Sequence, residues 1–138
     1  MNRLLAKAAA LGLSLGLLAV AAPASAHHSF AMFDFSKTVT LKGTVKEFQW
    51  TNPHVILWVE TDPAGADPGV LWSAELTSPG NLMRNGWSRH SLKEGDKIEL
   101  ELNPLRDGKH GGGFHKAVLV ATGQVLTGAS PGSKPPGQ

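Results

Sequence analysis

The six histidines are the residues of this 138-residue chain best suited to chemistry, because the chain contains no cysteine and no tyrosine. His27 and His28 directly follow Ala24-Ser25-Ala26, small residues of the kind that a signal peptidase reads. Cleavage after Ala26 would make His27 the first residue, so that its free amine and its imidazole bind one metal ion together. His28 adds a second ring. Neutral nitrogen donors in a flat arrangement suit Cu(II), which also heads the divalent affinity order.

His54 is the candidate third ligand, since an amino-terminal pair completed by a third histidine resembles the histidine brace of copper proteins. Cleavage after Ala24 would instead start the mature chain with Ser25-Ala26-His27, and a histidine at position three forms the amino-terminal Cu(II) and Ni(II) motif. Both cleavage sites therefore predict a copper ligand set. Two alternatives remain open: the first histidines are only a solvated terminus, and His54 only hydrogen-bonds the backbone of its turn.

Two more candidate metal ligands, His110 and His115, flank a run of three glycines and a phenylalanine. We expect a glycine-rich loop over Asn103 to His115 that lies between two strands and approaches the turn carrying His54. The three imidazoles would then converge. The flexibility of three consecutive glycines weighs against a preorganised site there.

No enzyme motif accompanies these histidines. The sequence has no nucleophile with a base at usable spacing, no HExxH, and no phosphate-binding glycine loop ahead of a helix. We therefore predict no catalytic residue and no organic cofactor, and a binding protein is the leading interpretation. An oxidative copper enzyme remains a further hypothesis, and it would need a substrate surface beside the histidines.

The first 26 residues are interpreted as a secretory signal peptide, with Arg3 and Lys7 leading into a long apolar run. This predicts export to the periplasm or the cell exterior; the alternative is an uncleaved membrane anchor. Without Arg3 and Lys7, eleven basic residues balance eleven acidic ones. Nucleic acid and anionic membranes are therefore disfavoured as partners, and no membrane span is expected after cleavage. Packing, rather than disulfides, must stabilise the domain.

Apolar runs between turn signals predict five strands. In the first strand, apolar residues from Val39 to Val45 alternate with polar ones, and the phase breaks at Lys46-Glu47, which predicts a bulge. A short helix between the third and fourth strands is framed by Ser78-Pro79 and Gly86. The predicted strands are Lys37 to Trp50, Val55 to Thr61, Val70 to Leu76, Lys97 to Leu102 and Lys116 to Val120.

This order predicts an all-β fold, a small five-stranded OB-like Greek-key barrel with one short helix between strands three and four. A β-sandwich of similar strands is the main alternative, and the position of the helix favours the barrel. The barrel domain is expected to span residues 27–126. Residues 127–138, rich in Gly, Ser and Pro, are expected to be a disordered tail.

The tryptophans are assigned to core or surface by their place in these elements. Trp58 and Trp72 lie within strand interiors and are expected in the core, whereas Trp87 follows the helix and is expected to be partly exposed. Leu82 and Met83 of the helix are expected to close one end of the barrel.

Several motifs in a fixed order resemble a known family. They are His27-His28-Ser29-Phe30 after the leader, Leu41-Lys42-Gly43-Thr44-Val45, Trp50-Thr51-Asn52-Pro53-His54, Ser78-Pro79 with Gly86-Trp87, and Leu92-Lys93-Glu94-Gly95-Asp96. From His27 to Leu126 the chain resembles a family of exported bacterial proteins, domain of unknown function 6152. The resemblance implies a periplasmic location and a small β-barrel. It brings no activity, cofactor or catalytic residue.

Two functions stand as hypotheses. The first is an exported, non-enzymatic binding protein that takes up Cu(II), or another late divalent ion, through His27 and His28, with His54 as the candidate third ligand. The second is a metal-independent interaction module that binds a protein, peptide or glycan of the cell envelope on the barrel face. The first hypothesis requires the mature amino terminus to reach the hairpin tip, and the second does not.

Overall fold

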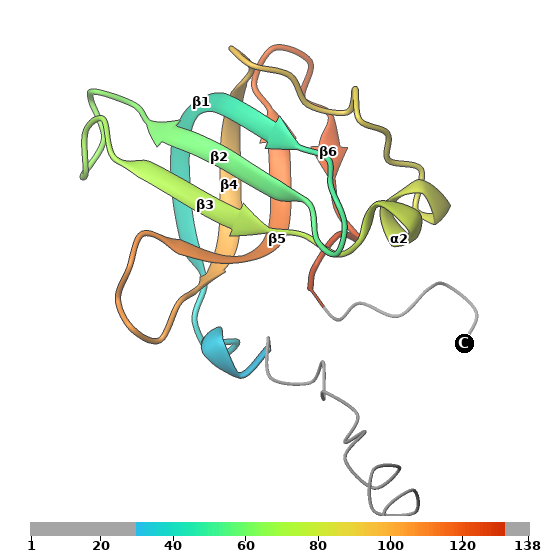
Figure 1. Ribbon diagram of the computed structural model, residues 1–138. Helices are drawn as coiled ribbons and strands as arrows, with labels where there is room; N and C mark the ends of the chain where they lie inside the picture. Colours follow the sequence, from blue (N-terminus) through green and yellow to red (C-terminus); the bar gives the residue numbers. More distant parts are fainter. Residues whose placement is uncertain (1–29, 132–138) are drawn as a thin grey trace, which may run out of the picture.

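The computed structural model describes residues 30–131, which form a closed five-stranded barrel (Figure 1). The strands follow the order β3-β2-β1-β4-β5, and β3 pairs with β5 in parallel to close the barrel, with β6 added at the edge of β5. The elements are η3 (Phe30–Met32), β1 (Val39–Gln49), β2 (Ile56–Thr61), β3 (Leu71–Glu75), α2 (Pro79–Arg84), β4 (Lys97–Pro104), β5 (Gly111–Leu119) and β6 (Val125–Leu126). The predicted OB-like barrel with its one helix is confirmed. Among these residues no helix has the length and apolar character needed to cross a membrane.

The bulge predicted in the first strand is present. The register between β1 and β2 shifts between Val45 and Glu47, so that Lys46 falls outside the pairing. Strand β1 pairs with β4 along its first half and with β2 along its second half. Because a bulge bends a strand and increases its twist, it helps β1 pass from one neighbour to the other as barrel closure requires.

The glycine-rich segment expected to be a loop is instead part of a strand. Strand β5 already starts at Gly111, and its first three residues pair with Ser73, Ala74 and Glu75 of β3. On its other side β5 lies so close to β4 that a Cβ atom on Gly112 would overlap the backbone carbonyl of Asn103 and lie 2.6 Å from Cδ1 of the Leu102 side chain. The glycines therefore form a tightly packed seam, and the prediction of a flexible loop up to His115 was wrong.

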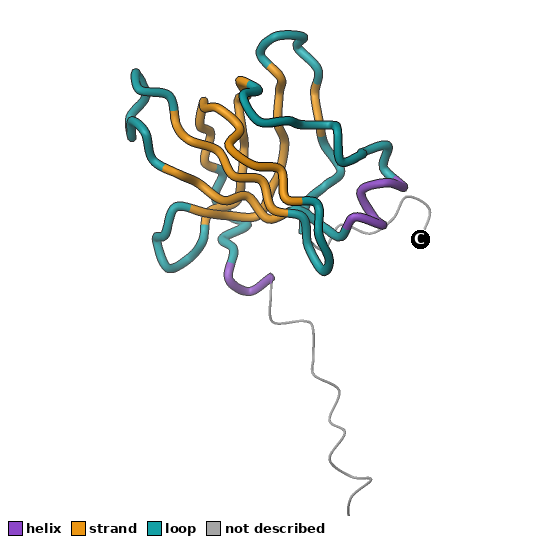
Figure 2. Tube along the Cα trace, turned by 45° about the horizontal axis from the view of Figure 1, so that its top comes forward, coloured by secondary structure: helices purple, strands orange, loops and turns teal. Residues whose placement is uncertain are grey.

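Helix α2 begins and ends where its sequence signals predict. The Ser78 side chain accepts a hydrogen bond from the Asn81 amide at 3.4 Å, and Pro79 is the first helical residue. Leu82 is fully buried against the barrel, whereas Met83 is 60% exposed. Only Leu82 therefore closes this end, and the expectation for Met83 was wrong. Figure 2 shows the helix at one side of the barrel, away from η3.

The core fills the barrel interior with inward-facing residues of all five strands. Trp72 is buried as predicted, but Trp87 is only 5% exposed, contrary to its predicted exposure. The Trp87 ring packs edge-on against Phe114 with centroids 5.5 Å apart, and its Nε1 donates a hydrogen bond to the Thr127 carbonyl at 2.9 Å. The fully buried large side chains are Phe33, Val45, Val55, Leu57, Val59, Leu76, Leu82, Leu92, Ile98, Leu100, Leu102 and Phe114.

The start of the predicted disordered tail packs on the domain. Residues 127–131 fold back beside α2, where the Asn85 side chain donates to the Gly128 carbonyl at 2.9 Å. The Thr77 amide donates to the carbonyl of Ala129, which has no exposed surface. These contacts extend the packed domain beyond the predicted boundary at Leu126, while the rest of the predicted tail lies outside the described residues.

Candidate functional site

The turn between β1 and β2 carries His54 next to a carboxylate of β3. Nδ1 of His54 lies 2.5 Å from Oε1 of Glu75, and the two side chains are 30% and 18% exposed. Oε1 of Glu75 has no contact with solvent and accepts no regular hydrogen bond within residues 30–131. The contact is thus close in distance but not ideal in angle, and the imidazole is the group that compensates this buried oxygen.

This contact determines which ring nitrogen of His54 remains for a ligand. Metal-binding histidines commonly donate one ring N–H to a carboxylate, which orients the ring and raises the basicity of the other nitrogen. Because Glu75 engages Nδ1, a metal would meet Nε2. The pair therefore has the arrangement of a carboxylate that supports a metal-binding histidine, with no second ligand beside it among residues 30–131. It also gives His54 a partner in β3, rather than in its own turn.

A hollow of about 200 Å³ lies on the outer face of β2 and β3, and Glu75 is one of its walls. Trp58 lines it as well, because the residues facing the barrel interior are its neighbours Leu57 and Val59, both fully buried. The expectation that Trp58 belongs to the core was therefore wrong. The lining residues are Met32, Phe33, Ile56, Trp58, Ser73, Glu75, Leu105 and Gly112.

The outward position of Trp58 predicts a modest effect on stability. Trp58→Ala should lower the free energy of unfolding by about 1–2 kcal/mol, since only part of its apolar surface leaves water on folding. Leu71→Ala on the adjacent strand is the control, because Leu71 is 49% exposed and should change stability by less than about 0.5 kcal/mol. Urea denaturation measures both. A loss above about 3 kcal/mol for Trp58→Ala would mean that the ring is a core residue.

The described chain begins beside this hollow. The Arg106 amide donates to the Met32 carbonyl at 2.9 Å, and Phe33 forms a β-bridge with Leu105. These contacts fix η3 against the loop between β4 and β5. His27 and His28 lie outside the described residues, but His27 precedes Phe30 by three positions, which is about 10 Å of extended chain.

Asp34 stabilises the turn that follows η3. Its Oδ1 accepts a hydrogen bond from the Ser36 hydroxyl at 2.6 Å, and Lys37 lies 3.3 Å from Oδ2. The Ser36 hydrogen bonds, followed by Lys37, hold the pKa of Asp34 below its ordinary value. The carboxylate therefore stays charged in mildly acidic solution, and the turn after η3 keeps its anchor there.

Of the predicted ligands within residues 30–131, His110 and His115 do not join His54. The ring of His110 packs on Trp72 with centroids 5.1 Å apart, and His115 faces Glu101, whose Oε2 lies 3.8 Å from its Nδ1. Within residues 30–131 no group of three His, Asp or Glu side chains is placed to bind a metal ion. A metal site of three such side chains that includes His54 would therefore need residues from outside this range.

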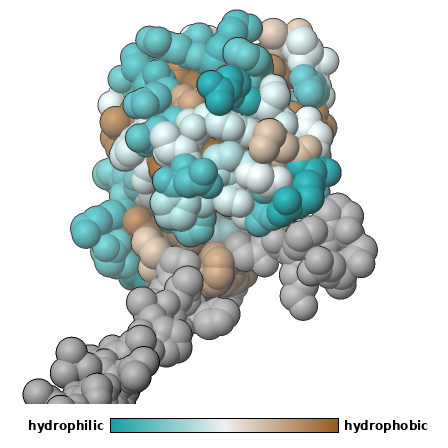
Figure 3. Space-filling model, turned by 45° about the vertical axis from the view of Figure 1, so that its right-hand side comes forward, coloured by the Kyte–Doolittle hydropathy of each residue, from teal (hydrophilic) through white to brown (hydrophobic). Residues whose placement is uncertain are grey.

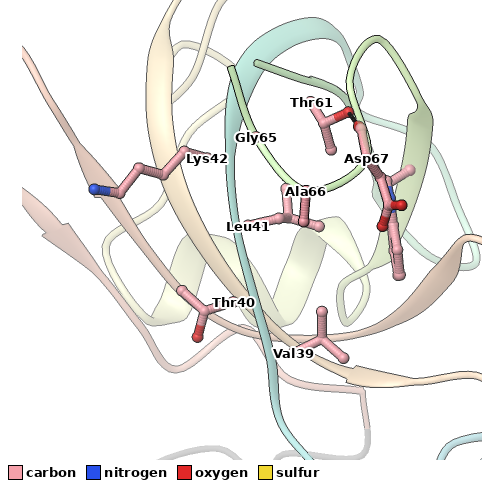
Figure 4. A pocket seen from close by; sticks show the side chains of 9 residues that line it. Val39, Thr40, Leu41, Lys42, Thr61, Gly65, Ala66 and Asp67 are labelled. Carbon is pink, nitrogen blue, oxygen red and sulfur yellow. Dashed lines mark hydrogen bonds between the residues drawn. The ribbon is translucent and has the colours of Figure 1, made fainter. Parts of the chain in front are cut away.

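A second hollow, of about 260 Å³, lies between β1 and the loop after β2 (Figure 4). Val39 and Leu41 approach it from β1, and Ala66 and Asp67 approach it from the loop. No histidine lines it. The face seen in Figure 3 carries scattered hydrophobic residues among hydrophilic ones, as is usual for a protein surface. The His54–Glu75 pair and the adjoining hollow therefore make the better candidate site.

Sequence reasoning missed Glu75 and the hollow. Glu75 and Ser73 alternate with buried Trp72 and Ala74, so their period of two was a signal that they face outward. Nothing in the local sequence indicates that Glu75 meets His54, because that contact depends on the pairing of β2 with β3.

Comparisons with known proteins add a family but no function. The model of a family of unknown function, DUF6152, matches residues 14–114. A search of curated proteins and a search of solved structures each found no match. The resemblance noted in the sequence motifs is thereby confirmed.

Proposed function

We propose that this chain, which belongs to the DUF6152 family of unknown function, is an exported binding protein that takes up Cu(II) through His27, His28 and His54. Removal of a signal peptide after Ala26 would place the protein in the periplasm or outside the cell. It would also free the amine of His27. The amine of His27 and the imidazoles of the three histidines are nitrogen donors of the kind that Cu(II) prefers.

The observation that carries the proposal is the contact between His54 and Glu75. The carboxylate 2.5 Å from Nδ1 occupies that side of the ring and leaves Nε2 as the nitrogen that an incoming ligand would meet. His115 also faces a carboxylate, but at 3.8 Å and with a side chain 56% exposed. His54 is thus the better oriented of these two imidazoles.

The entry of the chain supports the same proposal. Met32 and Phe33 line the hollow that Glu75 also lines, so the segment leading to the predicted amino terminus starts on the face that carries Glu75. The segment that leads to the predicted amino terminus includes η3, which Arg106 holds through hydrogen bonds to the carbonyls of Ala31 and Met32. Only a few residues then separate this anchored segment from His27.

Calorimetric titration with Cu(II) tests the proposal on protein whose first residue is shown by mass spectrometry to be His27. His54→Ala should weaken Cu(II) binding at least tenfold, because it removes the ligand that comes from outside the amino terminus. An added glycine before His27 should weaken it further, because the amine moves away from the imidazole. His115→Ala is the matched control and should change affinity less than twofold. Micromolar or weaker binding that no change affects would refute the proposal.

The hollow around Trp58 supports a second function, a metal-independent interaction module of the cell envelope. Strands two and three carry the ligand face of many OB-like barrels, and the hollow lies on these strands here. A half-buried tryptophan beside a carboxylate offers both apolar contact and charge. Binding of an envelope partner that persists in excess chelator would favour this function over copper uptake.

A further inference from the structure

The hollow beside Glu75 combines an apolar wall with a single carboxylate. Met32, Phe33, Ile56, Trp58 and Leu105 supply the apolar surface, and Glu75 is the ionisable residue among those that line it. His54 contacts the carboxylate but does not line the hollow. The imidazole and the hollow are thus two different neighbours of the same side chain.

Glu75 gives the hollow a negative charge that apolar neighbours do not compensate. Oε1 has no accessible surface, so the exposed 18% of the side chain belongs to its other atoms. Within residues 30–131 no Lys or Arg forms an ion pair with Glu75. A carboxylate among apolar groups favours a cationic ligand, and an indole face attracts the same charge.

The shape of the surface favours an extended ligand. Another hollow, of about 270 Å³, adjoins the hollow beside Glu75. The two share Met32 and Leu105. This other hollow is formed by η3 and the loop between β4 and β5, including Arg106, Asp107 and Lys109. The two hollows together, here named the Trp58 groove, suit a chain that runs across η3 better than one compact molecule.

We propose that the Trp58 groove binds an extended peptide segment of an envelope protein and that a lysine side chain of this segment enters the hollow beside Glu75. The ammonium group would pair with the carboxylate while the methylene chain lies on Trp58 and Ile56. A neutral glycan fits less well, because it offers no cation and the lining of the first hollow is mainly apolar. This inference rests on the second proposed function and is independent of copper.

The test uses two capped peptides, acetyl-Ala-Ala-Lys-Ala-Ala-amide and the same peptide with norleucine in place of lysine. The mature, ¹⁵N-labelled protein is titrated in the presence of EDTA, and the four tryptophan indole signals are followed by NMR. Trp58→Phe assigns the Trp58 signal. The lysine peptide should shift that signal saturably, and the norleucine peptide should bind at least tenfold more weakly.

Two variants test whether the carboxylate of Glu75 is the group that binds the lysine side chain. Glu75→Gln should weaken binding of the lysine peptide at least tenfold. Glu101→Gln is the matched control, because Glu101 is also a strand carboxylate near a histidine and is similarly exposed at 21%. It should change affinity less than twofold. The wild-type comparison of the two peptides stands even if a variant fails to fold.

Three results would overturn the inference. Equal binding of the norleucine and lysine peptides would exclude a cation site, as would undiminished binding to a folded Glu75→Gln variant. Equally tight binding of n-butylammonium would exclude a peptide as the occupant. If an envelope partner binds in chelator and does not respond to Glu75→Gln, the interaction function stands while the lysine site falls.

Discussion

Phe114→Ala is expected to lower the free energy of unfolding by about 3–5 kcal/mol. Phe114 has no exposed surface, and it lies in β5 opposite Leu102 of β4. Its ring contacts Trp87 edge-on at an interplanar angle of 83°. Removal of the ring would leave a cavity where the barrel core meets the end closed by α2, and neighbours held by two strands have little freedom to fill it.

Guanidinium denaturation of the variant measures this loss. The matched control is Phe35→Ala, because Phe35 is 52% exposed and should contribute less than about 1 kcal/mol. The denaturant slope should remain that of the native protein if the barrel persists. A loss below about 2 kcal/mol would mean that Phe114 is not a central core residue.

Gly112→Ala is expected to destabilise the protein by about 3 kcal/mol, although it adds one methyl group. The new Cβ would meet the carbonyl of Asn103 and Cδ1 of Leu102, the latter at 2.6 Å. The Asn103 carbonyl is backbone within β4 and has little room to move. Relief of the overlap would have to separate β5 from β4 or from β3, which it pairs with to close the barrel.

Gly80→Ala gives a control with the opposite expected sign. Gly80 lies in α2, where the atom nearest to an added Cβ is the flexible end of Arg84 at 4.0 Å. Alanine there should stabilise by about 0.5–1 kcal/mol, since it lowers the entropy of the unfolded chain. Thermal or urea unfolding of both variants measures the difference. A neutral Gly112→Ala would show that β5 is not closely packed against β4 at this position.

Some elements of the fold can be predicted from the sequence and others cannot, for physical reasons. The bulge at Lys46 and the cap at Ser78 follow from the order of a few neighbouring residues. Strand β5 does not, because a run of glycines has no intrinsic preference for a strand. It becomes one only because β3, almost forty residues earlier, offers hydrogen-bond partners at close range.

Trp58 and Trp87 illustrate the same limit for side chains. Residues 55–59 are all apolar, so their sequence alone does not reveal which face points inward. The pairing of β2 with β1 and β3 turns Leu57 and Val59 inward and leaves Trp58 at the hollow. Trp87 is buried against Phe114, and Thr127, in a segment that looks like a tail in the sequence, returns to accept a hydrogen bond from its indole.

The features of the candidate site likewise fall into those that the sequence predicts and those that only the tertiary structure decides. The sequence alone supplies the histidines at positions 27, 28 and 54, the prediction of a leader and the order of the strands, because donor type, hydropathy and turn chemistry are local properties. The contact of His54 with Glu75, the separation of His110 and His115, and the hollow beside Trp58 were decided by the tertiary structure. Each depends on strand register and barrel closure, which bring together residues that no short stretch of the chain contains.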